Sequence, residues 1–294
     1  MRDDQATRST SSSTDSSIRN IRLTVAYEGT RYAGWQVQPN HPTIQGEIER
    51  AILKLTRQEV RVLSAGRTDS GVHAFGQVAN FQIDFPIPPQ KWRPALQTHL
   101  PEDIVILESD EVPLEFHSTF SAKCKRYRYV IYNNLVDDPF LRPFSWRISQ
   151  PLDAKAMCEA AKCLIGKHDF RSFETDWPNK ATSVRTVTHL TVQRCGLDAV
   201  WQRSPLSDEP DFSISSGQET GKPCLCLEIE ADGFLYNMVR AITGTLVNVG
   251  RGTWTAGDVA RILHAQDRTI AGGTAPAQGL FLVRVYYPEI PESP

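Results

Sequence analysis

Residues 60–85 read VRVLSAGRTDSGVHAFGQVANFQIDF, and this stretch determines the architecture of the first part of the chain. Two strand-like runs, at residues 60–65 and 79–85, alternate apolar with polar residues. Successive side chains of a strand point to opposite faces of a sheet, so alternation indicates a half-buried strand. The glycine-rich loop between the runs carries a single carboxylate, Asp69. We therefore expect two strands joined by an exposed loop that presents Asp69.

The Asp69 loop has the composition of a catalytic turn. Gly66 and Gly71 allow the positive φ angles of a tight turn, and Arg67 favours the ionised form of a nearby carboxyl group. A charged carboxylate in a defined position is what nucleophilic catalysis by an aspartate requires. The same residues also fit a hairpin turn that is closed by an Asp–Arg pair, so both interpretations remain open from this loop alone.

Two other interpretations of the loop fail on chemistry. Gly66 and Gly71 have the spacing of phosphate-binding-loop glycines, but Val72 and His73 replace the lysine and the hydroxyl residue of that motif. Residues 69–71 match the Asp-Ser-Gly triplet of aspartic proteases, whose chemistry needs two carboxylates that share a proton. No second Asp-Ser/Thr-Gly triplet occurs in the sequence. Nucleotide binding and acid proteolysis are therefore disfavoured.

The pattern around the loop predicts two similar units. Asp153 is suited to cap a helix at residues 154–165 and Gly166 to end it. A short additional helix follows Thr255. Two units of this kind predict an α+β fold of two ferredoxin-like β-α-β-β-α-β halves. The expected elements lie at residues 21–27, 44–55, 60–65, 79–85, 91–100 and 104–107 in the first half, and at residues 126–132, 154–165, 185–192, 225–229, 237–249 and 281–287 in the second.

We expect three regions along the chain. Residues 1–18 are rich in Ser and Thr and should form a disordered tail. Residues 19–120 should form the N-terminal half with the Asp69 loop, and residues 121–290 the C-terminal half. Residues 196–222, rich in Ser, Pro, Asp and Gly, should form a variable surface insertion. The sheets of the two halves should flank a central cleft, which is the expected ligand site because ligands favour domain junctions.

Composition restricts the class of protein. Of the 294 residues, 40% are hydrophobic and 22% are charged, as in a soluble globular protein. No apolar run approaches the roughly 18 residues of a membrane span, and the polar N-terminus lacks the apolar core of a secretory signal. We therefore expect a cytoplasmic protein with six reduced cysteines and no membrane association. Cys224-Leu225-Cys226 lacks the two-residue spacer of zinc sites, so no metal is expected.

A basic segment follows at residues 123–130, which read KCKRYRYV. In a strand, Lys125 and Tyr127 share one face, whereas Arg126 and Arg128 share the other. An aromatic ring on a basic face can stack on a nucleobase while cations hold phosphates nearby. A charged edge strand that resists aggregation fits the same pattern. The net charge of −2 argues against a uniformly basic surface but allows a local one.

Taken together, these motifs resemble the TruA-type tRNA pseudouridine synthases, which act on the anticodon arm of tRNA. The resemblance extends over residues 21–288, and the tail and the insertion at 196–222 fall outside its pattern. It rests on five matches that occur in the same order as in the family. They are Gly34-Trp35-Gln36, residues 65–69 with 71–74, residues 125–129, Phe234 with residues 238–240, and residues 275–282.

The resemblance implies isomerisation of uridine to pseudouridine at tRNA positions 38 to 40, by base flipping and without a metal or organic cofactor. The implied partners are tRNA and a second subunit in a homodimer. Asp69 would be the nucleophile, at either C6 of the uracil or C1′ of the ribose. Arg240 would pair with Asp69 and lower its pKa. Tyr127 would stack on the flipped base and assist removal of the C5 proton. The remaining substrate-binding residues would be Arg67, Lys125, Arg128 and Leu280, beside Tyr127.

Two other classes compete with an isomerase. Ferredoxin-like sheets with exposed aromatic residues also describe RNA-binding modules that perform no chemistry. The intact Asp69 loop argues against such a module. A hydrolase that uses one activated aspartate is the other class, and it would need a partnered acid. The motifs provide no such acid, so the isomerase remains the leading hypothesis.

Overall fold

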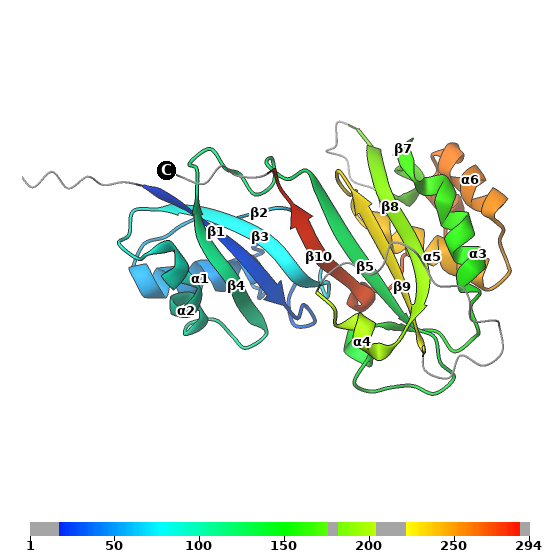
Figure 1. Ribbon diagram of the computed structural model, residues 1–294, viewed down its shortest axis with the longest axis horizontal. Coiled ribbons are helices and arrows are strands. Elements are labelled where there is room, and N and C mark those ends of the chain that lie inside the picture. Colours follow the sequence, from blue (N-terminus) through cyan, green and yellow to red (C-terminus); the bar gives the residue numbers. More distant parts are fainter. Residues whose placement is uncertain (1–17, 176–181, 204–221, 289–294) are drawn as a thin grey trace, which may run out of the picture.

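The computed structural model describes residues 18–175, 182–203 and 222–288 (Figure 1). Nearly all of the predicted tail at 1–18 and most of the predicted insertion at 196–222 lie outside these residues. The first unit has its elements in the expected order. They are β1 (Arg19–Tyr27), α1 (Ile44–Thr56), β2 (Leu63–Ser64), β3 (His73–Ile83), the 3-10 helix η1 (Pro89–Lys91), α2 (Trp92–Gln97) and β4 (Ile104–Val112).

The second unit contains the expected elements and several short additional ones. Its strands are β5 (Cys124–Tyr132), β6 (Trp146–Arg147), β7 (Gly166–Asp169), β8 (Val184–Cys195), β9 (Cys224–Ala231) and β10 (Leu280–Tyr286). Its α-helices are α3 (Ala154–Ala161), α4 (Leu197–Val200), α5 (Met238–Gly250) and α6 (Ala256–Ala265). Its 3-10 helices are η2 (Arg142–Phe144), η3 (Lys162–Leu164), η4 (Arg171–Phe173), η5 (Arg268–Ile270) and η6 (Ala277–Gly279).

Local capping chemistry explains where the helices begin. The Thr43 side chain accepts a hydrogen bond from a backbone N–H of the first turn of α1, and Asp153 does the same for α3, as the sequence predicted. Thr255 and Asp258 form a reciprocal capping box at the start of α6. Each cap satisfies backbone donors that the first turn of a helix leaves without a partner.

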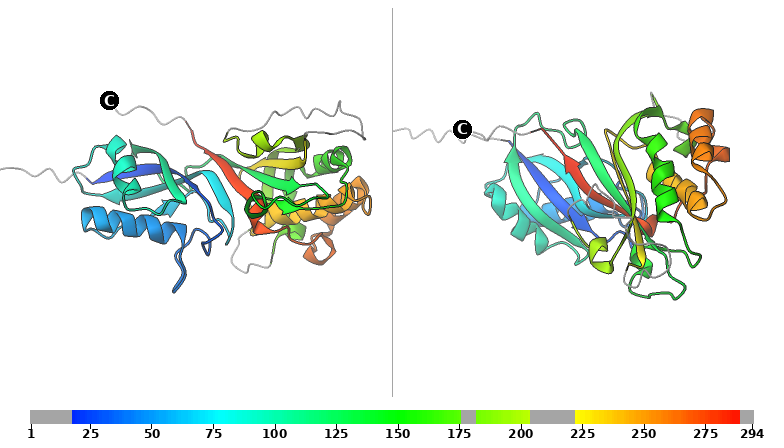
Figure 2. Two further views of the ribbon diagram at one scale, coloured as in Figure 1. Left: turned by 90° about the horizontal axis from the view of Figure 1, so that it is seen from below. Right: turned by 45° about the vertical axis from the view of Figure 1, so that its right-hand side comes forward.

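Within the described residues, ten strands form one mixed sheet in the order β4-β1-β3-β10-β5-β9-β8-β7. The short strands β2 and β6 pair with β3 and β5, respectively. Helices α1 and α2 lie against the strands of the first unit, and α3, α5 and α6 lie against those of the second (Figures 1 and 2). The fold class is therefore α+β, as predicted.

The two units meet at β10, which lies between β3 and β5. It runs parallel to β3 through two residue pairs, Phe281↔His73 and Leu282↔Ala74, and antiparallel to β5 over most of its length. The His73 ring stacks on Phe281 at a centroid distance of 4.8 Å. The sequence predicted a separate sheet for each half. That expectation is wrong, because the last strand joins both units into one sheet.

Strand boundaries differ from the prediction on either side of the Asp69 loop. Of the strand expected at residues 60–65, only Leu63–Ser64 pairs with β3. The following strand begins at His73 rather than at residue 79. β3 is longer than predicted because it pairs with β1 along nearly its full length, from Arg19↔Ile83 to Tyr27↔Ala74. The Asp69 loop is therefore anchored directly at the start of a central strand.

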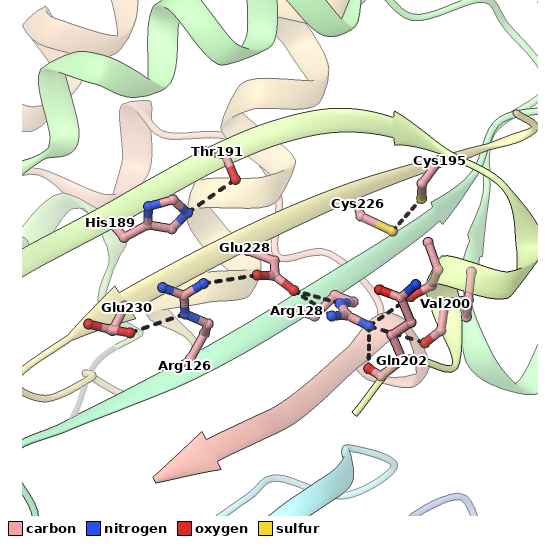
Figure 3. A network of polar contacts seen from close by, with 11 residues as sticks. Arg126, Arg128, His189, Thr191, Cys195, Val200, Gln202, Cys226, Glu228 and Glu230 are labelled. Atoms are coloured by element: carbon pink, nitrogen blue, oxygen red, sulfur yellow. Dashed lines mark hydrogen bonds and ion pairs between the residues drawn. The ribbon is translucent and has the colours of Figure 1, made fainter. Parts of the chain in front are cut away.

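A buried ionic network lies on the face of β5 that Tyr127 does not share (Figure 3). Arg128 donates to the Glu228 carboxylate through Nε at 2.8 Å and Nη2 at 2.6 Å, and both side chains are almost completely buried. Arg126 bridges Glu228 at 3.3 Å and Glu230 at 3.1 Å. Every charge in this group therefore has an opposite charge beside it, as a buried ion requires.

Arg128 was predicted to bind the substrate, and the structure contradicts this. Besides its ion pair, its Nη1 donates to the carbonyl oxygens of Ala199 at 2.8 Å and Gln202 at 2.7 Å, at the end of α4. None of its side-chain surface is exposed. Arg128 is therefore a structural residue that holds α4 against the sheet, which the alternation of β5 did not reveal.

We predict that Arg128→Met lowers the free energy of unfolding by about 3–5 kcal/mol, because breaking a buried ion pair leaves the remaining charge poorly compensated. Denaturant unfolding measures this change. Arg284→Met, on the exposed face of β10, is the matched control and should change stability by less than about 0.5 kcal/mol. Equal unfolding midpoints for Arg128→Met and the wild type would contradict the structural role.

Candidate active site

A cavity of about 760 Å³ lies where the two units meet. Its walls come from the loop at residues 33–41, the Asp69 loop, β5, the segment at 234–240 and the start of β10. The structure brings together six of the seven predicted site residues in this cavity, all except Arg128. They are Arg67, Asp69, Lys125, Tyr127, Arg240 and Leu280.

The backbone around Asp69 is held by close contact with the loop that carries the Gly34-Trp35-Gln36 motif. The Trp35 N–H donates to the Thr68 carbonyl oxygen at 3.0 Å. Gly34 has φ +95°, and a Cβ there would lie 2.5 Å from the same oxygen, so a side chain does not fit. The Thr68 and Tyr27 hydroxyl oxygens are 2.8 Å apart. These contacts fix the position of Thr68, the residue immediately before Asp69. They explain why the motif has a glycine at residue 34, where a side chain would not fit.

Arg240 reaches Asp69 from the first turn of α5. Its Nη1 lies 3.3 Å from Asp69 Oδ2, and the two side chains are only 17% and 25% exposed. The guanidinium is oriented by two further acceptors, the Ala275 carbonyl oxygen at 2.7 Å from Nε and Asn237 Oδ1 at 2.7 Å from Nη1. The predicted pairing of Asp69 with Arg240 is therefore present in the structure.

The pKa of the Asp69 carboxyl group is raised above its usual value, mainly because burial disfavours the charged form. The charge and the hydrogen bond of Arg240 act in the opposite direction and offset part of this effect. The sequence led us to expect a lowered pKa. Arg240 does lower it, as expected, but the loss of hydration in the cavity is larger.

Tyr127 lies in the same cavity on β5, with its ring edge-to-face against Phe234 at a centroid distance of 4.9 Å. Its side chain is largely buried. Among the described residues, its hydroxyl group has no hydrogen-bond partner. Burial raises the pKa of the Tyr127 phenol, and the nearby Tyr27 and Asp69 add to this. The phenol is therefore neutral near pH 7, which favours hydrogen-bond donation and disfavours a role as proton acceptor.

Lys125, Arg67 and Leu280 surround this group. Burial, together with the positive charge of Arg185, lowers the pKa of Lys125 to about 8. No ion pair of Lys125 is found in the part of the chain that the structure describes. Arg67 is exposed at the cavity wall, whereas Leu280 is buried and pairs with Tyr129 across β10 and β5. The cavity thus combines the positive charges of Lys125 and Arg67 with the apolar wall of Leu280.

The sequence did not reveal two polar groups that hold the Arg240 guanidinium, the Asn237 side chain and the Ala275 carbonyl oxygen. Asn237 has φ +62° before α5, and its side chain holds both Arg240 and the hydroxyl oxygen of Thr175, at 2.7 Å and 3.0 Å. An Asn before a helical pattern is a recognisable start signal, but its side-chain partners are not local. The Ala275 carbonyl oxygen is a backbone atom, so its contact with Arg240 could not be read from residue type, although Ala275 begins the motif at residues 275–282. His73, part of the motif, is structural: its Nδ1 accepts from the Gly29 N–H at 3.0 Å.

Within residues 18–175, 182–203 and 222–288, no three His, Cys, Asp or Glu side chains are grouped so that they could hold a metal ion. In the same part of the chain, every helix is too short or too polar to cross a membrane.

Comparison with known proteins assigns the chain to a family. The family model described as tRNA pseudouridine synthase matches residues 23–121 and 160–288. The tRNA pseudouridine synthase A of Thermoanaerobacter sp. (strain X514) is 43% identical over 270 residues, which are 92% of this chain and 100% of that protein. That of Moorella thermoacetica is 44% identical over 269 residues, or 91% and 99% of the two chains. The chain belongs to the tRNA pseudouridine synthase family, and the resemblance inferred from its motifs is confirmed.

We predict that Asp69 titrates above the pH of about 4 expected for a free aspartate, because burial favours its protonated form. Arg240→Met should raise the midpoint further, since Arg240 lowers the pKa. The carboxyl carbon resonance of Asp69, assigned with Asp69→Asn, reports this titration by NMR. As pH falls through this raised midpoint, protonation at Asp69 should make the folded state relatively more stable.

Asp258 is the internal control for this titration. Hydrogen bonds from Thr255 lower the pKa of its carboxyl group, and it lies on α6, outside the cavity. Arg240→Met should therefore leave the Asp258 midpoint unchanged. An Asp69 midpoint that does not respond to the loss of Arg240 would rule out the electrostatic coupling.

Proposed function

We propose that the protein isomerises uridine to pseudouridine in the anticodon arm of tRNA, at positions 38 to 40, with Asp69 as the nucleophile. The observation that carries this proposal is the Asp69–Arg240 pair, 3.3 Å apart in a cavity that also contains the Tyr127 ring. Membership of the tRNA pseudouridine synthase family and the names of its relatives support tRNA as the substrate.

The reaction needs one carboxylate because it is an isomerisation. An Asp69 oxygen forms a bond to C6 of the uracil or to C1′ of the ribose, and the bond between N1 and C1′ breaks. The base turns within the cavity, C5 bonds to C1′, the C5 proton is removed, N1 takes up a proton in its place, and the Asp69 carboxylate is released. No water is consumed, and no metal or organic cofactor is required. Arg240 keeps the carboxylate oriented throughout.

Base flipping brings the uridine to Asp69. A nucleotide within a helical stem must leave its stack, at a cost of a few kcal/mol. Stacking on Tyr127 would return about 1–3 kcal/mol, and the cavity volume of about 760 Å³ is sufficient for one nucleoside. Lys125 and Arg67 supply positive charge for the phosphates, and Leu280 provides an apolar wall for the base. The neutral Tyr127 hydroxyl can donate to the uracil, whereas removal of the C5 proton by Tyr127 would require its phenolate.

We also propose that residues 19–120 and 121–290 are two ferredoxin-like halves around an RNA-binding cleft. The first unit has the long strands β1, β3 and β4 and the short strand β2, and the second has the long strands β5, β8, β9 and β10. When the four strands of each unit are numbered along the chain, both units have the order 4-1-3-2. This shared order supports duplicated architecture. The active cavity is lined by residues of both units, as a cleft between two halves requires.

A homodimer in the cytoplasm completes the proposal. Leu135, Val136 and Phe140 are exposed by 77%, 70% and 84% on one loop after β5. Exposed apolar groups of this kind favour an interface. A second copy also has a net charge of −2, but its own basic residues would extend the local basic surface around tRNA. Light scattering that reports the mass of a single chain at micromolar concentration would contradict the dimer.

We predict that Asp69→Asn reduces pseudouridine formation by more than about a thousandfold, since loss of a nucleophile has effects on this scale. Binding of tRNA should change by less than about threefold, because the amide keeps the size of the side chain. Pseudouridine-specific chemical mapping of undermodified tRNA measures the reaction, and filter binding measures the affinity.

Asp84→Asn is the matched control, because Asp84 is exposed just beyond the end of β3 and outside the cavity. It should retain wild-type turnover. Full activity of Asp69→Asn would eliminate Asp69 as the nucleophile. A wild-type protein that binds tRNA without modifying it would instead favour a non-catalytic RNA-binding module.

A further inference from the structure

A second cavity of about 670 Å³ lies beside the active site in the second unit. Its walls come from η4, η5 and the residues that follow them. It contains two arginines and several hydroxyl groups, a composition suited to an anion. The lining residues that matter here are Arg171, Glu174, Thr175, Arg268 and Thr274.

Direct contacts connect this cavity with the active site. Asn237 lines the active cavity, and its Nδ2 donates to Oγ1 of Thr175 in the second cavity at 3.0 Å. Arg240 Nε donates to the carbonyl oxygen of Ala275, the residue after Thr274, at 2.7 Å. The two cavities therefore adjoin along the walls formed by Asn237 and Arg240.

Arg268 brings an uncompensated charge to the second cavity. Its Nη1 donates to the Gly272 carbonyl oxygen at 2.9 Å and its Nη2 to Thr274 Oγ1 at 2.9 Å. Both acceptors are neutral, and Arg268 has no carboxylate partner among the described residues. Its guanidinium is partly buried, which lowers its pKa, but an arginine remains protonated near pH 7. By contrast, Arg171 is paired with Asp169 at 3.1 Å.

Two hydroxyl groups are also available to an anion. Thr274 Oγ1 accepts from Arg268, and Thr175 Oγ1 accepts from Asn237, so each hydroxyl hydrogen remains free to donate. Glu174 lines the cavity and Asp267 lies near it, and each carboxylate accepts a hydrogen bond from a hydroxyl group. The buried Glu174 accepts the Ser183 hydroxyl at 2.7 Å, and Asp267 accepts from the Thr269 hydroxyl at 2.7 Å.

The segment that carries Arg268 is fixed relative to Arg240. A Cβ on Gly244 of α5 would lie 1.8 Å from the Gly273 carbonyl oxygen, so the two backbones touch without intervening side chains. The Gly272 N–H also donates to Thr245 Oγ1 at 3.0 Å. Because α5 positions Arg240, an anion on Arg268 would sit at a constant separation from the reacting groups.

We propose that the second cavity binds a backbone phosphate of the RNA strand that carries the target uridine, with Arg268 as the main cation and the Thr175 and Thr274 hydroxyls as donors. The proposal rests on the proposed function, because a nucleotide flipped into the active cavity is flanked by phosphates of its own strand. Phosphate binding here would hold the strand in register while the base turns. Direct phosphate contacts of this kind position a nucleic acid without reading its sequence.

Salt dependence gives the first test. Arg268→Gln should weaken binding of undermodified tRNA and reduce the slope of log K against log salt by roughly 0.7–0.9, the value for one phosphate contact. Arg261→Gln is the matched control, because Arg261 is 61% exposed on α6 and outside both cavities. It should leave the slope unchanged. Equal slopes for Arg268→Gln and the wild type would overturn the proposal.

Replacing one charged phosphate by an uncharged methylphosphonate identifies the phosphate that Arg268 contacts. In a series of anticodon-arm RNAs, each with a single methylphosphonate at a different linkage around the target uridine, the wild type should lose affinity at every linkage whose phosphate it contacts, and one of these is the linkage that Arg268 binds. Arg268→Gln should lose nothing further there, whereas Arg261→Gln should lose as much as the wild type. If Arg268→Gln loses the wild-type amount at every linkage, the proposal is wrong. If Arg268→Gln lowers the unfolding midpoint, Thr274→Val replaces it and should lose less affinity than the wild type at the linkage that Arg268 binds; a loss equal to that of the wild type at every linkage would then contradict the site.

Failure of this inference is distinguishable from failure of the proposed function. Pseudouridine formation by the wild type on the unsubstituted RNA tests the function alone. A wild type that modifies the RNA, together with an unchanged salt slope in Arg268→Gln, would reject only the phosphate site.

Discussion

The ion pair between Asp69 and Arg240 is the contact on which the rest of the candidate active site depends. It joins two residues that are 171 positions apart in the sequence, one in a loop of the first unit and one on the first turn of α5. Neither side chain is placed by its neighbours in sequence alone. Gly34 and Trp35 hold the loop, and Asn237 and the Ala275 carbonyl hold the guanidinium.

Burial determines the electrostatics of this pair. A carboxylate shielded from water loses hydration, which raises the pKa of Asp69, and Arg240 offsets part of that loss. The same shielding keeps Tyr127 neutral and lowers the pKa of Lys125 to about 8. A site of this kind is stable only if its backbone is fixed independently, and the pairing of β10 with both β3 and β5 provides that frame.

Helix caps and the two faces of a single strand could be predicted from the sequence, but the pairing of residues and strands far apart along the chain could not. Alternation placed Tyr127 and Arg128 on opposite faces of one strand, and the cap of Asp153 on α3 is confirmed. The sequence did not show which face of β5 is sealed, because that depends on Glu228 and α4 far along the chain. Nor did it show that β10 joins two sheets, since strand alternation carries no information about partners. The family motifs supplied what alternation lacked, the association of Arg240 with Asp69.

The most direct test of the account compares catalysis with binding when the cation of the central pair is removed. Single-turnover pseudouridine formation and tRNA affinity would be measured for Arg240→Met and the wild type. If Arg240 orients Asp69, the rate constant should fall by about a hundredfold, the scale of a misplaced catalytic group, with affinity changed less than about twofold. An unchanged rate constant, or parallel losses of rate and affinity, would contradict the account.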